Sequence, residues 1–136
     1  MAVEVRGEYT GGLKVRSVHG PSAATVTTEA PLDNGGTGGG FSPTDLVATA
    51  LGACMMTVMG IVSRRDGYAL EGATFRVEKH MQQDPRRIAK LPIVFRMPVG
   101  LGADARQKLE KAALACPVKR SLLETIEVTA TFEYPD

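Results

Sequence analysis

The sequence contains no tryptophan, and aromatic residues make up only 5% of its 136 positions. Proteins that hold single-stranded nucleic acids stack the bases on aromatic side chains, so this shortage argues against such a function. An excess of one charge is also missing, because 16 basic residues against 15 acidic ones give a formal net charge of +1. Nucleic-acid-binding domains normally carry a clear basic excess or stripe. We therefore expect no nucleic-acid partner.

Cysteine and histidine are scarce as well. Two cysteines in a chain of this length are not a disulfide framework, and the two histidines, His19 and His80, lack the paired spacing of metal ligands. The sequence also does not open with the basic and then apolar segments of a secretory signal. We therefore expect a cytoplasmic protein without a metal. In that reducing compartment a cysteine pair is more often catalytic or redox-active than structural.

Several familiar catalytic motifs are absent. The glycine-rich run at 34–40, NGGTGGG, is not followed by Gly-Lys-Ser/Thr and does not match G-x-G-x-x-G, so it predicts a flexible loop rather than a phosphate site. No G-x-S-x-G elbow supports a hydrolase triad. The composition, 43% hydrophobic and 23% charged, is that of an ordinary globular domain. It fits a small domain that acts on a small molecule or a partner.

A long helix is the clearest local signal. Alternating apolar residues predict short strands over 3–9, 13–18 and 24–26. Ser42, Pro43 and Asp45 then form the pattern of a helix start with a capping box. The run LVATALGACMMTVMGIV at 46–62 carries no charge, and SRRDG at 63–67 supplies cations and a glycine where the helix ends.

The apolar helix predicts a homodimer. Its charge-free run is too short and too rich in small polar residues for a membrane span, which needs about 20 apolar residues, so we expect no membrane partner. We interpret it as a helix buried on every side. One small domain can hardly surround such a helix, and a symmetric partner would cover the remaining face. Small residues would allow close approach of neighbouring backbones: Ala48, Ala50, Gly52, Ala53 and Gly60.

The second half of the chain alternates strands and helices. Strands are predicted over 73–81 and 88–97, with a turn at 83–85, and a last strand over 126–132. Helices are predicted over 104–115 and, after Pro117, over 118–123. The order is N-terminal strands, long buried central helix, further strands and helices, and a C-terminal strand. This order predicts a single α+β domain over residues 1–136.

Each cysteine has two interpretations. Cys54 lies in the middle of the apolar helix, where free cysteine commonly packs as a small hydrophobe. The helix end is about three turns away, so a Cys54 thiolate would need a cation from elsewhere. Cys116 directly precedes Pro117 and would lie at a helix N-terminus, which favours the thiolate. Core packing is the alternative for Cys116 as well.

The residues around Cys116 and the presence of a second thiol favour a reactive role for the cysteines. Lys119 and Arg120 add positive charge after Cys116. If the two cysteines meet, one can attack an oxidant and the other can resolve the product through a disulfide. The sequence therefore points to redox chemistry at Cys54 and Cys116.

Three motifs resemble those of the OsmC/Ohr proteins. They are GGFSPTDL at 39–46, ATALGAC at 48–54 and ACPV at 115–118, and the order of strands and helices agrees along nearly the whole chain. The resemblance implies an intertwined homodimer in which sheets of both chains wrap two long helices. It also implies a peroxidase that reduces organic hydroperoxides in oxidative-stress defence. Members of the family use no metal or haem and are reduced by external dithiols, lipoyl groups among them.

The resemblance also assigns roles to residues. Cys54 matches the peroxidatic cysteine and Cys116 the resolving cysteine. The better-characterised peroxidases have a glutamate directly after the proline that opens the long helix, and it orients an arginine against the reactive sulfur. Here that position is Thr44, and the acid follows one residue later as Asp45. One residue turns a side chain by about 100° on a helix, so Asp45 either orients the arginine or only completes the capping box.

The sequence offers more than one candidate for the arginine and more than one interpretation of the residues that would line a substrate pocket. The family arginine comes from the N-terminal strands, where Arg16 is the candidate and Arg6 the alternative. Met55, Met56 and Met59 would either line an apolar pocket for hydroperoxides or simply fill the core. The alternative function is a non-enzymatic dimeric protein that binds a small molecule or senses oxidation. A carrier of acyl groups is a third interpretation.

Overall fold

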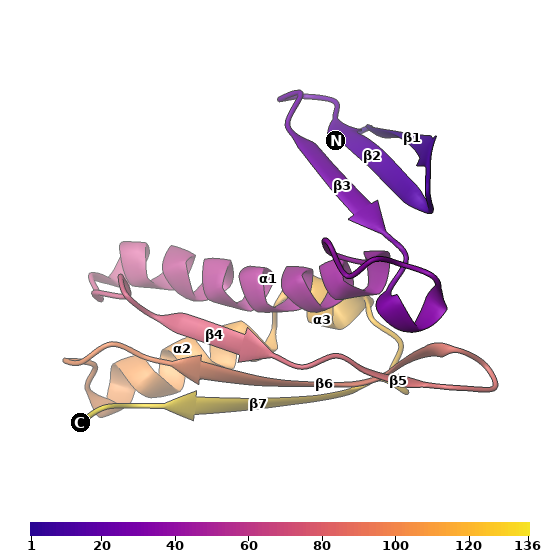
Figure 1. The fold of residues 1–136 in the computed structure, drawn as a ribbon. Coiled ribbons are helices and arrows are strands. Elements are labelled where there is room, and N and C mark those ends of the chain that lie inside the picture. The colour runs from indigo at the N-terminus through magenta and orange to yellow at the C-terminus, as the bar shows by residue number, and fades with distance from the viewer. The chain divides into compact units, whose positions relative to one another are not determined.

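An antiparallel sheet of three strands is formed within the first thirty residues (Figure 1). The computed structural model describes residues 1–136, which divide into two compact units, Met1–Leu46 and Val47–Asp136. In the first unit the order is β1 (Val5–Gly11), β2 (Lys14–His19) and β3 (Thr25–Glu29). The predicted N-terminal strands are thereby confirmed.

The turn and the loop of the first unit depend on glycine. Gly11 and Gly12 adopt φ values of 92° and 63° between β1 and β2, a region that glycine enters without a steric cost. After β3 a single 3₁₀ turn, η1 (Leu32–Asn34), leads into the glycine-rich loop. This loop connects the first sheet to the start of the long helix.

The long helix α1 (Pro43–Asp66) begins with the predicted capping box. The Asp45 N–H donates to Ser42 Oγ at 3.1 Å, and the Ser42 N–H donates to Asp45 Oδ2 at 2.9 Å. Two amide donors at the helix start are thus satisfied reciprocally. The predicted start of the helix is confirmed.

The second unit contains a four-stranded sheet around β6 (Arg87–Arg96). β4 (Thr74–Val77) and β5 (His80–Gln82) pair antiparallel with β6, and β7 (Glu127–Glu133) pairs parallel to it. The single strand that the sequence predicted over 73–81 is therefore two strands. β4 and β5 pair with different parts of β6, and the extended strand is interrupted between Val77 and His80.

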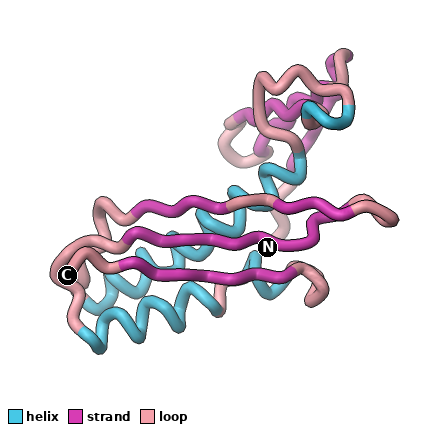
Figure 2. The backbone as a smooth tube through the Cα atoms, turned by 60° about the horizontal axis from the view of Figure 1, so that its bottom comes forward, coloured by secondary structure: helices cyan, strands magenta, loops and turns pink.

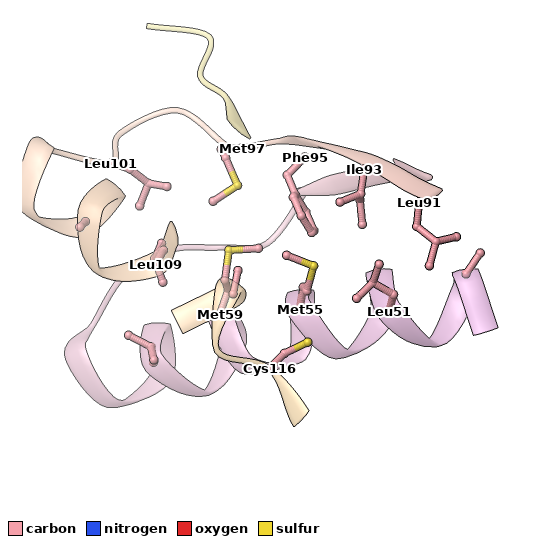
Figure 3. Packing of buried hydrophobic residues seen from close by; sticks show 14 of the residues in the cluster. Leu51, Met55, Met59, Leu91, Ile93, Phe95, Met97, Leu101, Leu109 and Cys116 are labelled. Carbon is pink, nitrogen blue, oxygen red and sulfur yellow. The ribbon is translucent and has the colours of Figure 1, made fainter. Parts of the chain in front are cut away.

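The helices α1, α2 (Ala103–Leu114) and α3 (Pro117–Ser121) lie on one side of this sheet (Figure 2). Alternate residues of β6, namely Leu91, Ile93 and Phe95, are fully buried and face Leu51 and Met55 of α1 (Figure 3). Alternation is expected of a strand with one buried face. The core of the second unit therefore lies between β6 and the helices.

Close packing between α1 and β4 depends on Gly52. A Cβ atom at this position would overlap the Phe75 ring, far inside any real contact distance. The absence of a side chain therefore makes room for an aromatic ring rather than for a neighbouring backbone. The Phe75 ring in turn packs at 6.2 Å from the ring of Phe95.

One chain buries only one face of α1. Ala53, Thr57 and Ile61 are exposed, and Ile61 retains 62% of its accessible surface. The interpretation that the helix is buried on every side is therefore not met within a single chain. By length and composition α1 is the one helix that could cross a membrane, although the core helix of a soluble protein passes the same test.

Candidate functional site

The two thiols, far apart in the sequence, meet in the second unit. Cys54 lies half-buried in the middle of α1, and Cys116 is fully buried in the core (Figure 3). Their side chains form a hydrogen bond, and both cysteines are free. The sequence predicted redox chemistry only if the two residues met, and the fold brings them into contact.

Cys116 occupies the predicted N-cap position. It precedes α3 with an extended backbone (φ −65°, ψ 146°), and Pro117 is the first helical residue. Its Sγ accepts the N–H of Lys119 at 3.3 Å. The sulfur of Cys116 is therefore held by α3 on one side and by Cys54 on the other.

The pKa of Cys116 departs from the sequence-based expectation. Burial raises the pKa of the Cys116 thiol, and the hydrogen bond and charge of Cys54 raise it further, whereas the Lys119 amide lowers it. The expectation that the helix end and nearby cations would favour the thiolate is therefore wrong in its net direction. Desolvation penalises the charged form, and α3 has only five residues to provide a dipole. Cys116 stays protonated at neutral pH and can donate toward Cys54.

Accessibility distinguishes the two sulfurs. Cys116 has no exposed surface, whereas Cys54 is partly exposed. A small oxidant can therefore reach Cys54 but not Cys116. Because the side chains already touch, oxidation of Cys54 could be followed by disulfide formation without a large displacement.

The predicted cation belongs to the first unit. Arg16 lies exposed in β2, in register with Glu8 of β1 and Thr27 of β3. The alternative, Arg6, forms an exposed ion pair with Glu4 at 2.8 Å. The assignment of Arg16 as the group that stabilises a Cys54 thiolate stays a prediction.

Asp45 completes the capping box, in which Ser42 is the N-cap residue. Asp45 Oδ2 accepts the Ser42 N–H, as the capping-box interpretation requires. Thr44, at the position where the family resemblance implies a glutamate, shares a hydrogen bond of 3.2 Å with Ser42 Oγ. The start of α1 is thus organised as a cap, and a role of Asp45 in orienting an arginine stays a prediction.

The three methionines differ in their surroundings. Met55 and Met59 are fully buried in the core and offer no surface to a ligand. Met56 is half-buried and lines a pocket on the other side of the helix. Core packing therefore explains Met55 and Met59, and only Met56 has surface available to a ligand. No cluster of three or more His, Cys, Asp or Glu side chains could hold a metal ion.

Comparison with known proteins places this geometry in a family. A family model described as OsmC-like protein matches residues 36–131. The chain belongs to the OsmC-like family. A solved structure from Psychrobacter arcticus, provisionally named an osmotic stress induced and detoxification response protein, is 35% identical. The alignment covers 95% of this chain and 94% of that one, with a TM-score of 0.91.

Other relatives of this OsmC-like chain are more distant. An uncharacterised protein of Acinetobacter baylyi is 28% identical over 127 residues, covering 88% of this chain and 85% of the relative. An organic hydroperoxide resistance protein from Legionella pneumophila shares the fold with a TM-score of 0.73 at 19% identity. That alignment covers 98% of this chain and 97% of the Legionella chain. The α+β fold of the family is thereby shown, and some distant members are hydroperoxide resistance proteins.

The sequence did not reveal a buried carboxylate at the end of β3 that holds the loop before α1 of this OsmC-like chain. Glu29 is only 4% exposed, and its carboxylate accepts the Thr37 hydroxyl at 2.9 and 3.0 Å and the Gly39 N–H. The Thr37 hydroxyl, the Gly39 and Gly40 amides and the charge of Lys14 hold the pKa of Glu29 below its usual range, against the effect of burial. The glycine-rich loop is therefore anchored, which corrects the expectation of a flexible loop.

Proposed function

We propose that this chain is a thiol-dependent peroxidase that reduces organic hydroperoxides. One observation carries the proposal: a half-buried Cys54 and a fully buried Cys116 share a hydrogen bond. The more accessible thiol is suited to meet the oxidant, and the buried thiol is suited to react second. The hydroperoxide resistance proteins among the distant members of the family agree with this chemistry.

The reaction proceeds in three balanced steps. The Cys54 thiolate attacks the terminal oxygen of ROOH, the O–O bond breaks, and Cys54 becomes a sulfenic acid. The departing alkoxide takes a proton from the solvent and leaves as the alcohol ROH. The Cys116 thiol then attacks the Cys54 sulfur, water leaves, and a disulfide forms. An external dithiol reduces this disulfide and is itself oxidised. Arg16 is our candidate for the cation that stabilises the first thiolate.

The proposal includes a homodimer that works in the cytoplasm. Along the outer face of α1, Ala50, Ala53, Thr57 and Ile61 follow one another at helical spacing and are exposed. A strip that is mostly apolar, with the Thr57 hydroxyl already bound to Ala53 O, is suited to a self-complementary two-fold contact. Two cysteines in a chain without a disulfide framework fit a reducing compartment.

The test counts free thiols after one equivalent of cumene hydroperoxide is added to reduced protein. We expect both thiols to disappear within seconds to minutes as one mole of cumyl alcohol forms per mole of protein. In Cys54→Ser the remaining thiol stays reduced, because Cys116 is buried and protonated.

Cys116→Ser is the matched variant. Its Cys54 still consumes one peroxide, but the product stops at a sulfenic acid that a dimedone probe traps. Thiols of the wild-type protein that stay reduced for hours would contradict the peroxidase and favour the non-enzymatic interpretation. Equal loss of thiol in Cys54→Ser would contradict the assignment of roles.

A further inference from the structure

The sulfur of Cys116 makes two different contacts in the reduced chain. It accepts the backbone N–H of Lys119 at 3.3 Å, which makes Cys116 the N-cap residue of α3. The same side chain shares a hydrogen bond with Cys54, and both cysteines pack against one apolar core. A single atom therefore connects the start of a helix to the thiol pair.

Formation of a disulfide changes the position of this sulfur. A covalent S–S bond is much shorter than the contact between two thiols, so at least one of the two sulfurs has to move toward the other. A Cys116 sulfur that moves toward Cys54 lengthens its contact with the Lys119 N–H. The amide then loses the side-chain acceptor that a helix start requires.

The two elements that carry the thiols differ in stiffness. Cys54 lies in the middle of α1, a helix of 24 residues with one face buried against the sheet. α3 has only five residues, and its side-chain hydrogen bonds stay within the segment that begins at Cys116, because the Ser121 hydroxyl donates to Pro117 O. A helix of less than two turns is marginal in water and depends on its cap. The displacement is therefore taken up at Cys116 and α3.

We propose that the disulfide between Cys54 and Cys116 uncaps α3, so that residues 117–121 loosen in the oxidised chain and become ordered again on reduction. The inference rests on the proposed function, because both need the thiol pair to close into a disulfide. Cys116 then acts as a redox-sensitive helix cap. Through it, the oxidation state of a fully buried sulfur controls the order of a whole segment.

The test uses diamide, which forms the disulfide without a peroxide. Diamide takes two electrons and two protons from the thiol pair and is reduced to the corresponding hydrazine. A loss of two hydrogens in the mass of a single chain confirms that the disulfide has closed between Cys54 and Cys116. The order of α3 is then measured by NMR as the hydrogen exchange of backbone amides in the full chain.

The informative amides are those of Lys119 and Arg120, which bind Cys116 Sγ and Cys116 O in the reduced chain. We expect oxidation to speed their exchange about threefold to tenfold, the effect of losing one helix cap. The Ser42 amide, which binds Asp45 Oδ2 at the start of α1, is the internal control and keeps its rate.

Three variants separate the cap from other effects of oxidation. Cys116→Ser keeps a side-chain acceptor at the N-cap and cannot form the disulfide, so exchange in α3 stays slow with and without diamide. Cys116→Ala has no acceptor, and its α3 exchanges as fast as that of oxidised wild type before any oxidant is added. Cys54→Ser retains the cap, and diamide leaves its α3 unchanged.

Equal exchange of the Lys119 amide in reduced and oxidised wild type overturns the proposal, and so does slow exchange in Cys116→Ala. It is also wrong if diamide does not close the disulfide within one chain, or if the Ser42 amide accelerates as much as that of Lys119. Failure of the peroxidase gives a different result. In that case cumene hydroperoxide leaves both thiols reduced, while diamide still uncaps α3.

Discussion

Both faces of α1 carry apolar side chains, but their surroundings differ. On the inner face, Leu51, Met55 and Met59 are completely buried against the sheet. On the outer face, the apolar side chains of Ala53 and Ile61 are exposed in the single chain. The difference shows that hydropathy indicates how strongly a helix prefers burial. It does not indicate whether the same chain or a second copy covers the helix. Inner-face contacts are intramolecular, and we propose that outer-face contacts are made with a second copy.

The largest expected effect is on the inner face. Met55→Ala removes a fully buried side chain and should lower the free energy of unfolding by about 2–5 kcal/mol, because it leaves a cavity in a packed core. Urea denaturation at several protein concentrations measures it. The difference from wild type should be the same at each concentration, since the lost contacts lie within one chain. A loss below about 1 kcal/mol would show that this core is not tightly packed.

A substitution on the outer face should instead affect association. Ile61→Asp places a charge in the proposed contact and should weaken the dimer about a hundredfold, which corresponds to about 2.7 kcal/mol. Analytical ultracentrifugation over a range of concentrations measures the change, and Arg64→Lys, which keeps the charge, is the control. If Ile61→Asp remains a dimer of wild-type affinity, a second copy does not cover the outer face.

Two glycines of α1 provide a finer comparison. Gly52→Ala should lower the free energy of unfolding by about 1–3 kcal/mol, because its Cβ would meet the Phe75 ring. Gly60→Ala should raise it by up to about 1 kcal/mol, because alanine favours the helix and the nearest atom is 3.9 Å away. Thermal denaturation of the two variants checks both signs. Equal effects of the two substitutions would contradict the asymmetry between the faces.

The smallest effect concerns the loop that precedes α1, and it is present at neutral pH and lost in acid. The pKa of Glu29 is lowered in the folded chain, so the unfolded chain binds more protons as the pH falls below about 4.5. The stabilisation by Glu29 is therefore present above that pH and is lost as the pH falls through the folded-state pKa. Glu29→Gln should lower the free energy of unfolding at pH 7, and its difference from wild type should narrow in acid.

Denaturation of both proteins between pH 3 and pH 7 measures this narrowing, with Glu8→Gln as the exposed control. A constant difference between Glu29→Gln and wild type across that range would show that the Glu29 charge does not anchor the loop.

Local features of the site could be predicted from the sequence. The Ser42–Asp45 capping box and the N-cap position of Cys116 depend on residues within three positions of each other, and both are confirmed. The family motifs also led to the correct fold class. These predictions succeed because hydrogen-bond geometry at helix ends is set by near neighbours.

The errors concern quantities that distant parts of the chain decide. The rise in the pKa of Cys116 comes mainly from burial, which depends on the whole core. Glu29 binds loop residues eight to ten positions further along the chain, and no local sequence pattern predicted these hydrogen bonds. The break between β4 and β5 depends on how each strand pairs with β6.

The sequence by itself determined most of the helices and strands, the helix caps and the apolar character of α1, because backbone propensity and side-chain periodicity act over a few residues. Only the tertiary structure decided that the thiols of Cys54 and Cys116 touch, that Cys116 is the buried one and which face of α1 meets the sheet. The physical reason is that desolvation and contact between distant residues exist only once the chain has packed.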